Sequence, residues 1–296
     1  MLAEPRPRPL IRPPPPKPFR FLRRKAQPLT TVVAIDSRDG LIMASDLQAT
    51  AGGVIEFTSK IRPVRSNELI GCAGTAEYID IFYRYVARSL SAEERPRDYL
   101  QLLNNAVDEY GEYIDERIDK LGMESLPEFD RHQCYPEGIL AVDDGSTRKR
   151  IFQIQTPHPC GEIPDFQHRL CVGSGGAAAT ILLRVLENVM LTWEVNHQSL
   201  TWTHFSWRTV GQFCTILLRR ISEIDPYSRG KDIQLLDGGS SRGVPYKEMF
   251  DSEKIPEQLT EFALSVVKEV TPATLFKFFN DPNTNFVRVL EALGLG

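Results

Sequence analysis

The sequence predicts an α+β fold, a four-layer αββα sandwich in which two β-sheets pack face to face between pairs of helices. The order of its elements predicts this: apolar runs of strand length, two helices, more strands, two helices and a last strand. A chain of 296 residues, 42% of them hydrophobic, is also long enough to bury such a core.

The first half of the chain is expected to hold a β-hairpin, further strands and two helices. The hairpin signal is the turn Ser37-Arg38-Asp39-Gly40 between two apolar runs, and the helices follow from apolar residues at helical spacing. In chain order, these elements are the hairpin over residues 30–46, strands over 54–64 and 68–72, and helices over about 76–90 and 97–121.

The second half repeats this order after an irregular stretch over 121–137. The elements expected are strands over 138–142, 150–155 and near 170–173, helices over about 177–189 and 209–224, a strand over 232–236, and helices over 253–270 and 272–279. All three tryptophans lie in 191–207, an insertion between two helices. They form either an interface patch or, more commonly, a cover over the core.

The first 29 residues differ from the rest in composition. They hold nine prolines and eight Lys/Arg against one acidic residue, Glu4, so they cannot bury apolar surface and are expected to be extended or disordered. The chain therefore divides into a Pro/Arg-rich leader over 1–29, expected to be a propeptide, a main domain over 30–246 and a C-terminal helical extension over 247–296.

Charge and composition exclude several classes of protein. The leader carries +7 of a net charge of −4, so the remainder carries −11, which argues against nucleic acid as the main partner. No run approaches 18 apolar residues, so no membrane-spanning helix is expected. Five cysteines without a CxxC pair favour a reducing compartment, the cytoplasm. His132-x-Cys134 and His158-x-Cys160 are each only half a metal site, so neither metal nor cofactor is expected.

Thr30 is the candidate nucleophile. A threonine that becomes the first residue carries its own base, the α-amine, if a nearby cation holds the amine's pKa down and a backbone N–H stabilises the oxyanion. Asp46 follows the strand over 41–45 and Lys60 lies on the next one, so Asp46 could orient Lys60 beside Thr30. The alternative is a surface ion pair.

Five segments resemble proteasome β subunits and their bacterial relative HslV, the N-terminal-nucleophile (Ntn) threonine peptidases. The intervals of 16 residues from Thr30 to Asp46 and 14 from Lys60 to Gly74 match the family and select Thr30 over Thr31. The resemblance covers about residues 30–240. Its segments, in family order, are Thr30-Thr31-Val32-Val33-Ala34 with the run from Gly40 to Gly52, Lys60-Ile61, Ala73-Gly74-Thr75-Ala76, Gly173-Ser174-Gly175, and Asp225-Pro226-Tyr227-Ser228-Arg229-Gly230.

This resemblance implies an Ntn-hydrolase fold and a role for each matching residue. Thr30 would supply nucleophile and amine base. Lys60, positioned by Asp46, would lower the amine's pKa, and Gly74 would donate the oxyanion N–H. Three residues would hold the Thr30 amine and hydroxyl by hydrogen bonds: Ser174, Asp225 and Ser228.

The resemblance also implies how substrate binds. The backbones of Thr50, Gly74 and Ala76 would pair with an extended peptide. Cys72 would lie at the base of the first specificity pocket, and its apolar character predicts cleavage after apolar residues. Asp80, one helical turn past Ala76, would instead favour a basic residue there.

The function implied is that of a threonine-type endopeptidase made as a zymogen. Autocatalytic release of Thr30 would activate a subunit that degrades unfolded polypeptides inside stacked rings of six or seven copies or related subunits, with an ATP-driven unfoldase as partner. Two alternatives remain open. Leu29 stands where active members usually carry glycine, and Arg229 replaces the first glycine after Ser228, which favours an inactive, unprocessed ring subunit. A non-proteolytic Ntn amidohydrolase is the other, since a fold does not fix its substrate.

Overall fold

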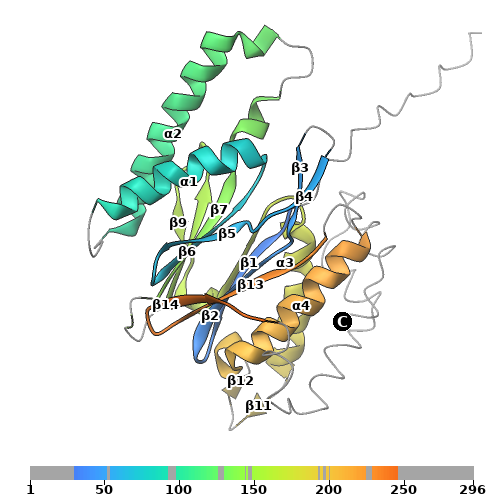
Figure 1. Cartoon of the computed structure of the whole chain (residues 1–296). Helices are drawn as coiled ribbons and strands as arrows, with labels where there is room; N and C mark the ends of the chain where they lie inside the picture. The colour runs from blue at the N-terminus through green and yellow to red at the C-terminus, as the bar shows by residue number, and fades with distance from the viewer. Residues whose placement is uncertain are drawn as a thin grey trace, which may run out of the picture.

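The computed structural model describes residues 30–51, 54–92, 98–125, 130–143, 145, 149–192, 194–195, 198–199, 201–224 and 229–245. The leader and the two helices expected after residue 250 lie outside these ranges, so the proposed domain division remains a prediction. Within them, two five-stranded antiparallel sheets and four α-helices make up the fold, and the expected α+β class is confirmed (Figure 1).

The first sheet contains the expected N-terminal hairpin at its centre. Arg38 and Asp39 form the turn, and the closing strand lies beside the hairpin, with Asp232 opposite Ser45. Across the sheet the strands are β10 (Arg169–Val172), β1 (Val32–Ser37), β2 (Gly40–Ser45), β13 (Asp232–Asp237) and β14 (Ser240–Gly243).

The second sheet takes only part of the strand region expected over 54–64. That region holds two strands, because its two halves pair with different partners, the first with residues 48–51 and the second with residues 68–71. The first, β4 (Val54–Phe57), pairs with β3 (Gln48–Ala51) in a separate two-stranded ribbon. The strands of the second sheet are, in order across it, β5 (Ile61–Arg65), β6 (Glu68–Ala73), β7 (Glu137–Asp143), β8 (Lys149–Gln155) and β9 (Gly161–Glu162).

All four expected helices that fall within the described ranges are confirmed. They are α1 (Ala76–Ser91), α2 (Tyr99–Leu121), α3 (Gly176–Thr192) and α4 (Trp207–Ile224). The side chain of Asp98 caps the start of α2 by accepting from the N–H of Gln101, and Gly122 ends it in the left-handed conformation with φ +58°. No helix in the described part of the chain is both long and apolar enough to cross a membrane. Two short strands, β11 (Glu194–Val195) and β12 (Gln198–Ser199), lie between α3 and α4.

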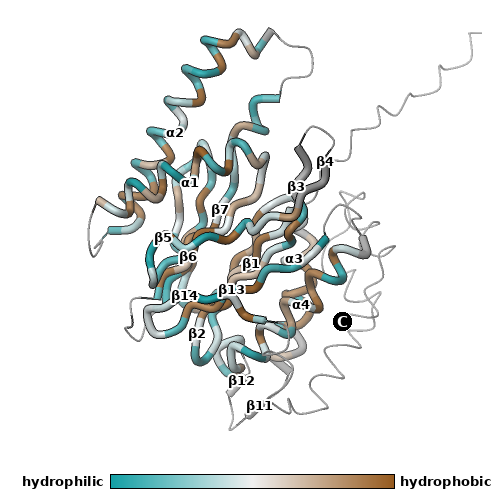
Figure 2. The backbone as a smooth tube through the Cα atoms, in the orientation of Figure 1, coloured by the Kyte–Doolittle hydropathy of each residue, from teal (hydrophilic) through white to brown (hydrophobic). Residues whose placement is uncertain are grey.

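Three hydrophobic clusters hold these elements together. Because side chains alternate along a strand, β1 contributes to two of them. Val32 and Ala34 pack with Ile139 of the second sheet, whereas Val33 and Ile35 pack with α3 and α4. The third cluster joins the second sheet to α1 and α2. Figure 1 shows α1 and α2 beside the second sheet and α3 and α4 beside the first, and Figure 2 shows hydrophobic residues concentrated in strands such as β1 and β7.

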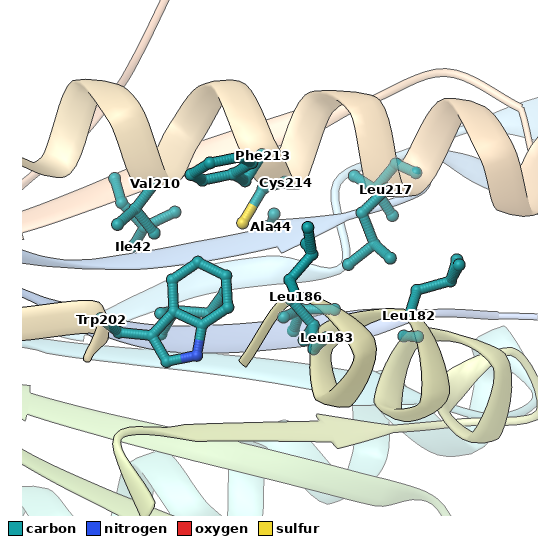
Figure 3. Close-up of a cluster of buried hydrophobic side chains, with 14 of the residues drawn as sticks. Ile42, Ala44, Leu182, Leu183, Leu186, Trp202, Val210, Phe213, Cys214 and Leu217 are labelled. Atoms are coloured by element: carbon teal, nitrogen blue, oxygen red, sulfur yellow. The ribbon is translucent and has the colours of Figure 1, made fainter. Parts of the chain in front are cut away.

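The tryptophan-rich insertion covers the core, as the commoner interpretation predicts. Trp202 and Trp207 are 2% and 7% exposed and belong to the cluster between α3, α4 and the first sheet. Figure 3 shows Trp202 in this cluster. The Trp202 ring packs edge-on against Phe213, with 5.8 Å between centroids, and its indole N–H donates to Glu187 at 2.7 Å. Trp193 lies outside the described residues.

Truncation of Trp202 is expected to destabilise this half of the protein. Trp202→Ala removes a fully buried ring and leaves the carboxylate of Glu187 without its indole donor, so the free energy of unfolding should fall by about 3–5 kcal/mol. Urea unfolding followed by circular dichroism measures this change. Trp202→Phe keeps most of the volume and should cost less; equal losses in the two variants would contradict a packing role.

Candidate active site

Thr30 lies just before β1 and is held on three sides. Its backbone N–H donates to Ser174 Oγ at 2.9 Å, and its carbonyl accepts from the N–H of Gly175 at 3.0 Å. Its hydroxyl Oγ1 accepts from the ammonium of Lys60 at 3.3 Å. Only 8% of the residue is exposed. Both its nitrogen and its hydroxyl therefore have a defined polar partner.

The pair expected between Asp46 and Lys60 forms, and it is buried. Lys60 Nζ lies 2.5 Å from Asp46 Oδ2, and the two side chains are 5% and 1% exposed. The other carboxylate oxygen of Asp46 accepts from the N–H of Thr31 at 2.7 Å. Asp46 thus fixes the lysine ammonium and the chain beside Thr30 at once. The alternative of a surface ion pair is wrong.

Burial sets the electrostatics of this pair. Desolvation raises the pKa of Asp46 above its ordinary value, and the charge and hydrogen bond of Lys60 oppose the rise. Removing a partner from a buried pair leaves an uncompensated charge, which is far costlier than losing a surface pair. The arrangement therefore keeps a positive charge 3.3 Å from a threonine hydroxyl.

Four of the expected catalytic residues line one cavity of about 710 Å³: Thr30, Lys60, Gly74 and Ser174. Gly74 connects β6 to α1 with φ +144°, a conformation that L side chains rarely adopt. A β-carbon there would also lie 3.3 Å from the backbone of Pro136. The glycine is thus required by the strand-to-helix turn at the cavity wall.

The residues expected to bind substrate are divided between the cavity and the core. Ala76 and Asp80 line the cavity, but Asp80 forms an ion pair with Arg62, which also lines it. Cys72 is not among the lining residues; it is buried in the cluster with α1 and α2, and burial raises the pKa of its thiol to about 12. The backbone of Thr50 lies in β3, opposite Ile55.

The last two expected hydrogen-bonding residues, Asp225 and Ser228, lie outside the described residues. The chain is described again from Arg229, whose carbonyl accepts from the N–H groups of Leu47 and Gln48 at 3.0 and 3.1 Å. These hydrogen bonds place Arg229 beside the start of β3, within two residues of Asp46.

The sequence pattern alone did not identify several cavity residues. Arg62 follows Lys60 by two positions, so strand alternation could have placed both on one face. Glu137 offers no local signal, since only the pairing of β7 with β6 brings it opposite Ala73, next to Gly74. The remaining cavity residues outside the expected set are Gln48, Thr58, Ser59, Ala73, Thr75, Ile79, Asp130, His132, Gln133, Tyr135 and Gly173.

The cysteines of the two half-sites considered for a metal take part in structural contacts. Cys134 is buried, and its carbonyl accepts a hydrogen bond from the hydroxyl of Tyr110. The N–H of Cys160 donates to Asn104 at 2.8 Å. Among the described residues, no group of three or more His, Cys, Asp or Glu side chains is placed to hold a metal ion.

Comparison with known proteins supports the resemblance found in the sequence. Residues 29–114 match the family described as Proteasome subunit. A curated protein named Proteasome subunit beta, from Nanoarchaeum equitans, is 24% identical over 164 residues, which are 55% of this chain and 77% of that protein. The similarity to a proteasome β-like family is thereby confirmed and supports a proteasome-like role.

Proposed function

Because the chain is similar to proteasome β subunits, we propose that it is a threonine-type endopeptidase, with Thr30 as nucleophile after release from Leu29. The observation that carries this proposal is the position of Lys60 Nζ, 3.3 Å from Thr30 Oγ1 and 2.5 Å from Asp46 Oδ2. A buried ammonium held against a hydroxyl beside a cavity is suited to activating that hydroxyl.

The proposed chemistry needs no cofactor. Cleavage of the Leu29–Thr30 bond turns the Thr30 nitrogen into a free amine, which accepts the proton of Oγ1 as that oxygen attacks a substrate carbonyl carbon. The N–H of Gly74 donates to the oxyanion, and Lys60 lowers the pKa of the amine. The amine then protonates the leaving nitrogen as the peptide bond breaks, and water hydrolyses the ester. Three residues would hold the Thr30 amine and hydroxyl, as the resemblance implies: Ser174, Asp225 and Ser228.

Substrate is proposed to bind as an added strand along Thr50, Gly74 and Ala76. Cys72 would form the base of the first specificity pocket, beneath the cavity wall. The ion pair with Arg62 already neutralises the Asp80 carboxylate, which argues against a preference for a basic substrate residue. The pairing favours cleavage after apolar or neutral residues.

The wider assembly follows from the same similarity. We propose an Ntn-hydrolase αββα sandwich over 30–246, a propeptide over 1–29 and a C-terminal extension over 247–296. The subunit would act in the cytoplasm within stacked rings of six or seven, built from copies or related subunits, and degrade polypeptides delivered by an ATP-driven unfoldase.

A second candidate is a catalytically inactive ring subunit that keeps its leader. Leu29 and Arg229, at two positions where glycine is usual in active relatives, favour it. A β-carbon at residue 29 narrows the conformations open to the bond that must be attacked. A non-proteolytic Ntn amidohydrolase would instead hydrolyse a small amide and no peptide.

The intact mass of the purified, assembled protein tests the proposal. We expect the mass of residues 30–296 and covalent labelling of Thr30 by a peptide electrophile that reacts with N-terminal nucleophiles. A full-length, unlabelled chain in assembled rings would establish the inactive subunit instead. Hydrolysis of small amides by the processed chain, without cleavage of any peptide, would establish the amidohydrolase.

A further inference from the structure

Glu137 is a cavity residue to which the chemistry above gives no role. It is the first residue of β7 in the second sheet, is exposed, and lies opposite Ala73, next to Gly74. Its carboxylate oxygen Oε2 accepts from the N–H of Gly173 at 3.0 Å. Gly173 follows β10 of the first sheet, so this hydrogen bond connects the two sheets at the wall of the cavity.

The turn that Glu137 holds is the one that holds Thr30. Ser174 Oγ accepts from the Thr30 nitrogen, and the N–H of Gly175 donates to the Thr30 carbonyl. Gly173 has φ +89°, and a β-carbon there would lie 2.3 Å from the Thr30 carbonyl oxygen. The turn and Thr30 are thus in direct contact, and a shift of Gly173 would be transmitted to the Thr30 nitrogen.

Glu137 differs from the other charged residues around Thr30 in the kind of partner that its side chain has. Lys60 pairs with Asp46, and Arg62 pairs with Asp80. Asp130 accepts from the backbone N–H of His132 at 3.0 Å, and both residues line the same cavity. Within the described residues, the hydrogen-bond partner of the Glu137 carboxylate is a neutral backbone N–H. Its negative charge therefore lies against the turn beside the Thr30 nitrogen, and no Lys, Arg or His side chain in the described part of the chain forms an ion pair with it.

We propose that Glu137 is a positioning residue for the Thr30 amine: it fixes the turn of residues 173–175 across the two sheets, and its negative charge stabilises the ammonium formed during turnover. The electrostatic part rests on the proposed function, because only a released Thr30 has an amine. The positioning part concerns the folded chain whether or not it is processed. The two parts can be separated because glutamine keeps the acceptor oxygen and loses the charge.

Amide hydrogen exchange of the assembled protein tests the positioning part. In Glu137→Ala, exchange at Gly173 and at Gly175 should accelerate by about tenfold, the size expected for loss of one hydrogen bond that holds a turn. In Glu137→Gln the amides of Gly173 and Gly175 should exchange at the wild-type rate. The same is expected of the control Glu116→Gln, which removes a surface ion pair on α2. Unchanged exchange at Gly175 in Glu137→Ala would overturn the role, even in an active enzyme.

The pH dependence of peptide cleavage tests the electrostatic part. A neighbouring negative charge favours the protonated amine, so its removal in Glu137→Gln should move the acid limb of kcat/KM to lower pH by about half a unit. Glu137→Ala should lower kcat by about tenfold with little change in KM. A Glu137→Gln profile that coincides with the wild type overturns the electrostatic part. A wild-type chain that neither processes nor cleaves contradicts the proposed function, and the exchange experiment then decides the positioning role alone.

Discussion

Replacement of Thr30 by alanine is expected to abolish peptide cleavage. The change removes Oγ1, the atom held 3.3 Å from Lys60 Nζ, and with it the proposed nucleophile. Loss of an activated nucleophile in a well-studied serine protease reduces kcat by roughly 10⁶-fold, and a loss of that order is expected here. Cleavage of a fluorogenic peptide by the assembled protein measures it, and the same variant should retain residues 1–29 in its intact mass.

Two matched variants separate the nucleophile from its neighbour. Thr30→Ser keeps a hydroxyl and should retain measurable cleavage. Thr31→Val should behave like the wild type, because the buried Thr31 hydroxyl has no hydrogen-bond partner among the described residues and the hydrogen bond from its backbone N–H to Asp46 is kept. Full activity in Thr30→Ala would contradict the assignment of Thr30, and loss of activity only in Thr31→Val would move it to Thr31.

Replacement of Lys60 by methionine is expected to cost both activity and stability. Methionine keeps much of the side-chain length but leaves the carboxylate of Asp46 buried without its cation. Breaking a buried pair in this way costs about 3–5 kcal/mol in the free energy of unfolding. Peptide cleavage should fall below detection as well, because the hydroxyl of Thr30 loses the ammonium that donates to it. Chemical denaturation and the peptidase assay measure the two losses.

The loss of stability in Lys60→Met should depend on pH. Burial already raises the pKa of Asp46, and removal of the lysine raises it further. Between the ordinary carboxyl pKa and this raised value, the folded state holds a proton that the unfolded state has released. Stability therefore falls as pH rises through this interval. Lys60→Met combined with Asp46→Asn should recover part of the stability at neutral pH and none of the activity. A loss that is the same at acid and neutral pH would contradict the cause given.

Much of the fold follows from local patterns because helices and hairpins depend on neighbours in the sequence. The periodic apolar residues of α1 and α2 predict helices whose bounds in the structure differ by only one or two residues. The region over 54–64 is different. Its apolar residues indicate strands, but the division into two strands depends on partners in other segments, since β4 pairs with β3 and β5 pairs with β6. No pattern within the region could therefore assign β4 to the ribbon and β5 to the second sheet.

By itself, the sequence determined the types of the helices and strands, because apolar periodicity is a local property. It also determined the candidate nucleophile and the two residues of the buried pair, because the spacing of motifs along the chain can be compared with that of a known family. Only the tertiary structure decided that Asp46 and Lys60 are buried together, that Arg62 pairs with Asp80, and that Glu137 holds the turn beside Thr30. Glu137 and Gly173 are 36 residues apart and come from different sheets. The packing of the two sheets brings them together, and packing is a property of the whole chain that no local pattern contains.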